Sequence, residues 1–126
     1  MTAEHVVARL HEANVSGLGW SVIEGGLSDK IEGPQVAVMD TAGFPPIAAH
    51  GTRGPLRAGV QVLVRGAPRA YEAARSKAVA VWGALHRESF GPVMSCEGRN
   101  NPVWLGYGEE QRPMWSLNFV AFLKHP

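Results

Sequence analysis

Hydrophobic residues recur at helical spacing in two parts of the chain. Within residues 69–86, one narrow arc of a helical wheel holds Tyr71, Ala74, Ala78, Val81, Trp82 and Leu85. The opposite side of this predicted helix carries small residues, which reflect either the high helix propensity of alanine or the close approach of another backbone. A shorter amphipathic pattern predicts a first helix over roughly residues 3–14, with Thr2 as its cap and stop signals at Asn14 and Gly17.

Segments rich in β-branched or alternating residues predict the strands. In the range 60–65 one face consists of valine, and Leu63 on the other face predicts a central strand that is covered on both sides. The range 35–40 is a second predicted strand, and 114–123 contains the apolar–polar alternation of a half-buried strand. Two shorter candidate strands lie at 93–97 and 103–105.

Residues 41–59 contain four glycines and three prolines, a composition that opposes any regular element and predicts a long loop. The loop holds three large apolar residues, Phe44, Ile47 and Leu56, which indicate that it packs on another surface. The order of helix, strand, strand, helix and strands predicts a single α+β domain over residues 1–126. Its two principal helices are expected to pack on a mainly antiparallel or mixed sheet.

The composition adds one anomaly. Charged residues make up 18% of the chain, below the usual quarter, so either neutral polar groups or contacts with another protein cover part of the surface. The net charge of +1 is too balanced for a protein held to nucleic acid by phosphate neutralisation. The sequence contains neither a long apolar run nor a signal-peptide pattern, so we expect no association with a membrane.

No catalytic or metal-binding motif stands out. The five histidines lack metal-ligand spacing, and Cys96 is the single cysteine of the chain. A lone cysteine in a predicted strand is typical of a small buried hydrophobic residue. We therefore expect no enzyme activity, no metal and no cofactor. The alternative is a small enzyme or ligand-binding domain that uses Cys96 or a histidine.

Two stretches of the chain resemble the tail terminator family of long-tailed bacteriophages, also called minor capsid proteins. The first is the strand and Arg-Gly turn at 60–66, followed by the helix at 71–86. The second runs from the segment 102–106 through Glu109 and Arg112 to the strand at 115–119. The predicted first helix fits the family more loosely, and the loop at 41–59 corresponds in position only.

This resemblance implies an α+β subunit of a hexameric ring at the head-proximal end of the tail tube. Such a ring ends tube polymerisation and presents a surface to the head–tail connector or stopper protein, and DNA passes through its lumen without specific binding. The implied partners are further copies of the chain, the tail tube protein and the connector. The resemblance also implies that the protein is assembled in the host cytoplasm and is located in the tail or neck of the virion. The alternative is another head–tail joining protein, a stopper or a tail-completion protein.

Ring closure through a head-to-tail interface needs apolar surface beyond the core of one subunit. The candidates for this interface are Phe44, Ile47 and Leu56 of the loop, Ala73, Ala80 and Ala84 of the second helix, and Arg65. The guanidinium of Arg65 either fixes the turn that follows its strand or pairs with a carboxylate of a neighbouring subunit.

Axial docking to the tube and the connector is expected to be more polar, because these partners fold separately before they meet. The candidates are the charged residues of predicted loops: Arg53, Arg57, Glu109, Glu110 and Arg112. For each of these residues, an ordinary solvated position in a loop is the alternative.

Overall fold

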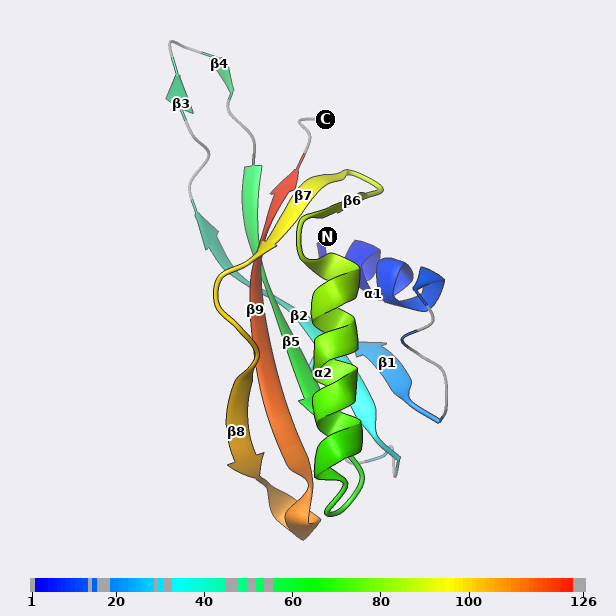
Figure 1. Cartoon of the computed structure of the whole chain (residues 1–126). Helices are drawn as coiled ribbons and strands as arrows, with labels where there is room; N and C mark the ends of the chain where they lie inside the picture. The colour runs from blue at the N-terminus through cyan, green and yellow to red at the C-terminus, as the bar shows by residue number, and fades with distance from the viewer. Residues whose placement is uncertain are drawn as a thin grey trace.

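The computed structural model describes residues 2–13, 15, 19–28, 30, 33–44, 48–49, 52–53 and 56–123. A curled seven-stranded sheet has the strand order β1-β2-β5-β9-β7-β6, and β8 pairs with the same edge of β9 as β7 does (Figure 1). The strands of this sheet are β1 (Ser21–Glu24), β2 (Gln35–Phe44), β5 (Leu56–Arg65), β6 (Glu88–Phe90), β7 (Val93–Gly98), β8 (Val103–Tyr107) and β9 (Pro113–Leu123). A separate ribbon pairs β3 (Ala48–Ala49) with β4 (Thr52–Arg53).

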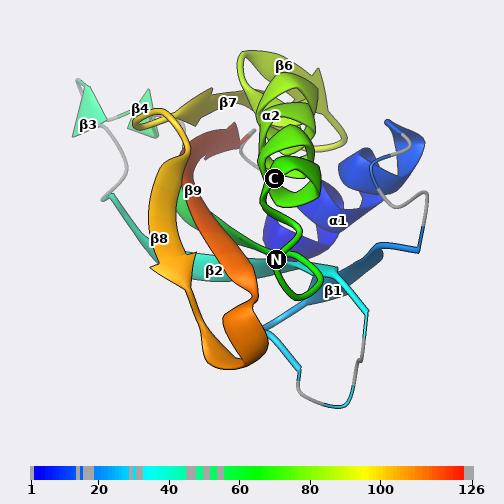
Figure 2. The same ribbon diagram turned by 60° about the horizontal axis from the view of Figure 1, so that its bottom comes forward.

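Two helices, α1 (Thr2–Glu12) and α2 (Tyr71–Leu85), lie on the same face of the sheet and contact each other (Figure 2). The arc of α2 that the spacing predicts is the one that packs, since Ala74, Ala78, Val81 and Leu85 are all buried. They join the inward-facing valines of β2 and β5 and the side chains of Leu117 and Phe119 in one core. The prediction of an α+β fold with two principal helices on a mixed sheet is therefore confirmed.

The central strand β5 is covered by helices on one face. Val60, Val62 and Val64 are buried, whereas Leu63 on the other face is half-buried, and no helix of the described residues lies over it. The expectation that this strand is covered on both sides is wrong. Leu63 is sheltered by its cross-strand neighbours instead, because Ala37 and Ser116 lie beside it in register.

The segment 41–59 contains strand as well as loop, so the expectation of a long irregular loop is also wrong. β2 continues to Phe44 and β5 begins at Leu56, and the two strands pair as far as Phe44 and Arg57. A bulge between Thr41 and Phe44 absorbs the irregularity, because an extra residue bends a strand without ending its pairing. Beyond them, the β3–β4 ribbon forms one end of the molecule (Figure 1).

The first turn of α1 is capped from a distant strand. Thr2, the predicted cap, is itself the first residue of the helix, and the carboxylate of Asp40 on β2 accepts a hydrogen bond from the backbone N–H of Ala3 at 3.0 Å. A carboxylate at this position satisfies an N–H group that has no partner within the helix. The bond also fastens α1 to the sheet.

Strand β7 is fastened to α2 by an unusually close approach. A Cβ atom added to Gly98 would lie 2.1 Å from two ring carbons of Trp82. The Trp82 ring stacks on His86 with 4.5 Å between centroids, and Nδ1 of His86 accepts a hydrogen bond from the Gly98 N–H at 3.0 Å. A side chain at position 98 would therefore force the Trp82 ring to move.

Candidate assembly surfaces

Cys96 does not have the environment of a nucleophile. Its side chain is buried on β7, and burial, with a smaller contribution from the neighbouring Glu97, raises the pKa of the thiol to about 12. Reactive cysteines need the opposite shift. Within the described part of the chain, no three histidine, cysteine, aspartate or glutamate side chains come together in a way that could hold a metal ion. None of the described helices is long and apolar enough to span a membrane.

The charged residues proposed for axial docking separate into two groups at opposite ends of the molecule. Glu109 and Glu110 lie in a short 3-10 helix, η1 (Glu109–Gln111), at the turn between β8 and β9 (Figure 1). Both residues are exposed. Arg53 on β4 and Arg57 near the start of β5 belong to the end that carries the β3–β4 ribbon.

The turn at 108–112 is joined by hydrogen bonds to the loop at 66–70. The Gly66 N–H donates to the carbonyl of Pro113 at 2.9 Å, and the Arg69 N–H donates to the carbonyl of Gln111 at 2.7 Å. Arg112 contributes to the same contact, because its Nη1 lies 3.5 Å from the Gly66 carbonyl and its Nη2 lies 3.6 Å from a carboxylate oxygen of Glu110.

Arg112 is consequently a poor docking residue. Its side chain is only 12% exposed, against 72% for that of Glu110. We assign to Arg112 the task of holding the turn that presents Glu109 and Glu110. The two glutamates remain candidates for docking.

The end with the β3–β4 ribbon carries several of the other sequence candidates. Phe44 is the last residue of β2 and Leu56 the first of β5, whereas Ile47 lies outside the described residues. Arg57 is half-buried and has Phe44 and Phe122 as its cross-strand neighbours. The expectation that Arg57 belongs to a loop is therefore wrong, because β5 pairs with β2 on one side and β9 on the other at this position. This pairing extends β5 into the glycine- and proline-rich segment.

The small residues of α2 do not all face outward. Ala73 and Ala80 are exposed, but Ala84 is 7% exposed and packs toward α1. The Ala84 carbonyl accepts a hydrogen bond from Nε of Arg9 at 3.0 Å, so this end of α2 is in contact with α1 of the same chain. Ala84 is therefore removed from the set of interface candidates, and Ala73 and Ala80 stay in it.

Arg65 is engaged within its own chain. Its Nη2 lies 3.3 Å from the carbonyl oxygen of Ser28. The buried side chain of Gln35 binds the same residue twice, accepting from the Ser28 N–H and donating to its carbonyl, both at 2.9 Å. The guanidinium thus helps to fix the connection before β2, and its pairing with a neighbouring subunit stays a prediction.

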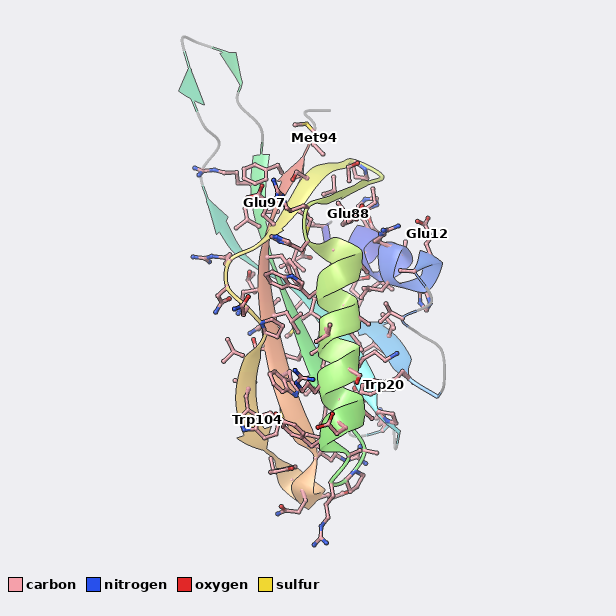
Figure 3. All side chains as sticks on the ribbon, in the orientation of Figure 1. Glu12, Trp20, Glu88, Met94, Glu97 and Trp104 are labelled. Carbon is pink, nitrogen blue, oxygen red and sulfur yellow. The ribbon has the colours of Figure 1, made fainter. Side chains whose placement is uncertain are left out.

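Strand β8 is the surface feature that sequence reasoning missed. Its four large apolar side chains are 37–51% exposed: Val103, Trp104, Leu105 and Tyr107. Trp104 faces the helix side, where its ring contacts those of Tyr71 and Trp115 with centroid distances of 5.0 and 5.3 Å (Figure 3). The sequence signal that could have revealed this surface is the apolar run at 103–105, which lacks the alternation of apolar and polar residues that is typical of a half-buried strand.

Comparisons with known proteins show what the fold resembles. No protein-family model matches the chain. No curated protein matches it either. Among solved structures, a chain from the structure described as "Virion of native gene transfer agent (GTA) particle" is similar over 98% of this chain and 94% of that chain, with a TM-score of 0.71 and 14% sequence identity. At this identity the likeness shows a shared fold.

Proposed function

We propose that this protein is a structural protein of a phage-like virion, and in particular that it forms a ring, as the tail terminator resemblance implies, on the head-proximal end of the tail tube. The observation that carries the proposal is the fold likeness to a chain of a gene transfer agent virion, which extends over nearly the whole of both chains. The sequence resemblance at 60–122 independently points to the same class of particle.

The distribution of candidate surfaces supports this role. A ring between a tube and a connector needs two axial faces and a separate lateral contact between subunits. Glu109 and Glu110 occupy one end of the molecule, and the β3–β4 ribbon with Arg53 occupies the other. Exposed apolar side chains lie between these ends on β8 and α2. In the proposed ring of six copies, the two ends contact the tube and the connector, and the lumen lets DNA pass without specific binding.

The direct test is the native mass of the purified protein, alone and mixed with the tail tube protein of the same particle. We expect six times the chain mass in at least one of these conditions, together with tubes whose length stops increasing once the protein is added. A protein that stays monomeric in both conditions and leaves tube length unchanged would disprove the proposal.

A charge variant tests axial docking separately from ring formation. In the double variant Glu109→Lys/Glu110→Lys, we expect the ring to persist and tube capping to weaken, because the axial face loses its acidic side chains. The matched control, Glu12→Lys/Glu97→Lys, makes the same change in net charge at exposed positions away from that turn. Equal capping by both variants would remove Glu109 and Glu110 from the axial face.

A stopper or tail-completion protein is the other candidate within this class. Such a protein would bind the connector and would not limit tube length. The position of the ring in an imaged virion distinguishes the two roles.

A further inference from the structure

The outer edge of β8 is an open sheet edge. β8 pairs with β9 on one side, from Val103 opposite Ser116 to Tyr107 opposite Pro113. Among the described strands, none pairs with its other side. An edge of this kind presents backbone N–H and C=O groups that a further strand can bind.

This edge lacks most of the protection that free edges usually have. Proteins block them with lysine, proline or inward-pointing charges. Residues 103–107 contain no charged residue and no proline, and the one protective device is a bulge around Leu105. Exposed fractions of 51% for Leu105 and 50% for Tyr107 make the edge strongly apolar. Because such a strand promotes aggregation when it is left uncovered, its sequence indicates a surface that is covered in the functional assembly.

The opposite end of the same sheet supplies a matching edge. β1 is the terminal strand, paired in parallel with β2 from Ser21 opposite Gln35 to Glu24 opposite Val38. No other described strand pairs with it, and its first three residues, 21–23, carry no charge. The two edges have similar lengths, five residues in β8 and four in β1.

The strand directions make these two edges compatible in a rotational assembly. β8 runs antiparallel to β9, β9 antiparallel to β5, β5 antiparallel to β2, and β2 parallel to β1. β8 therefore runs opposite to β1. Rotation of one copy about an axis roughly along the strands keeps the direction of β1, so the β1 edge of the next copy meets β8 in antiparallel orientation. Every copy then offers one edge and accepts one, which is the head-to-tail contact that closes rings.

We propose that β8 of one subunit pairs with the β1 edge of the next, so that the sheet continues across each subunit boundary. This inference rests on the proposed ring and names the contact that closes it. Main-chain hydrogen bonds would supply affinity, and the side chains of Val103 and Leu105 would be buried at the boundary. The helix-free face of the sheet would then also be continuous from one subunit to the next.

Disulfide capture tests the pairing directly. Val103 on β8, and Ser21 and Ile23 on β1, all lie on the helix-free face, as their cross-strand partners Ser116, Gln35 and Ala37 show. The double variants Val103→Cys/Ile23→Cys and Val103→Cys/Ser21→Cys sample two registers. Under mild oxidation at least one is expected to give a ladder of linked multimers on a denaturing gel. The native Cys96 is buried and does not compete.

The single variants serve as controls for the direction of the contact. Val103→Cys alone is expected to stay unlinked, because β8 meets β1 rather than another β8. An efficient dimer from this single variant would overturn the proposal in favour of a symmetric contact between like edges. Rings without a ladder in either register would overturn it as well.

A charged substitution provides the second test. Leu105→Glu is expected to abolish ring formation, alone and with tube protein, because it places an unpaired carboxylate in the boundary. The matched control is Met94→Glu, since Met94 on β7 is also an exposed apolar residue, at 44%, and belongs neither to the two edges nor to α2. Intact rings from Leu105→Glu would overturn this contact and leave the ring itself established. Rings that persist while tube capping is lost would place tube protein on β8, which also overturns the proposal. A wild type that never forms rings would disprove the proposed function and this contact together.

Discussion

Strands β7 and β8 pair with the same edge of β9, one after the other along its length, and they differ in how completely the rest of the chain covers them. β7 places Val93 and Cys96 in the core under α2 and turns the charged Glu97 outward. β8 has exposed apolar side chains on both faces, and two of them, those of Trp104 and Tyr107, belong to a group of aromatic rings. β7 therefore contributes two residues to the buried core, whereas β8 contributes none.

The difference indicates which parts of the fold are covered by the chain itself. The burial pattern of β7 is explained by α2 and β6, both of which belong to the same chain. No described element explains the composition of β8 in the same way. An apolar strand whose outer edge pairs with none of the described strands has the features expected of an assembly surface.

The largest expected effect is at the close approach between β7 and α2. Gly98→Ala is expected to lower the free energy of unfolding by roughly 1–3 kcal/mol, because the added Cβ would collide with the Trp82 ring. Chemical denaturation measures the change. Gly83→Ala is the control, since a Cβ there meets nothing within 4 Å and alanine favours a helix. Equal stability of the two variants would contradict the tight packing of β7.

The next effect concerns Trp104, the side chain of β8 that contacts three other aromatic rings. Trp104→Ala is expected to cost about 1–2 kcal/mol of unfolding free energy, because it removes ring contacts with Tyr71, Trp115 and Tyr107. Trp104→Phe is expected to recover much of the loss, as measured by thermal denaturation. If Trp104→Ala left the free energy of unfolding unchanged, the aromatic contacts of β8 would not stabilise the fold. The difference in stability contribution between β7 and β8 would then be larger than the ring contacts indicate.

A smaller effect depends on pH and tests the burial of β7. The unfolded Cys96 thiol ionises near its ordinary pKa of about 9, whereas the folded thiol keeps its proton up to about 12. Ionisation therefore favours the unfolded state above pH 9, so the stability that the thiol contributes is complete below pH 9 and is lost toward pH 12. We therefore expect the free energy of unfolding of the wild type to fall relative to that of Cys96→Ala as the pH rises from 9 toward 12, as measured by chemical denaturation at several pH values. A constant difference would mean that solvent reaches the thiol.

The smallest effect on stability is expected at the outer surface of β8. Leu105→Glu is expected to change the free energy of unfolding of the monomeric subunit by less than about 0.5 kcal/mol, because the side chain is half exposed and has no core contact to lose. Denaturation of dilute protein, where assembly is absent, measures this value. A loss as large as that of Gly98→Ala would show that β8 is part of the subunit's own core.

The candidate site was only partly predictable from the sequence. Glu109 and Glu110 are exposed at one end of the molecule, as loop charges should be, whereas Arg112 in the same turn is engaged with the Gly66 carbonyl. In the sequence, an arginine in a predicted turn looks the same whether its side chain faces solvent or contacts a loop more than forty residues away in the chain. Ala84 is similar, since its burial depends on how α1 crosses α2 and not on its position in the helix.

The sequence by itself determined the elements whose pattern repeats within a few residues. The spacing along α2 and the valines of β5 specify which side faces the core, because neighbouring turns and alternate strand residues share one environment. Tertiary structure decided the rest. Pairing with a partner strand turned much of the segment 41–59 into β-structure, and the Asp40 carboxylate capped a helix 37 positions away in the chain. The Trp82 ring occupies the space that a side chain at position 98 would need. Each of these depends on backbone groups and volumes that meet only after the chain folds, and a local pattern cannot encode them.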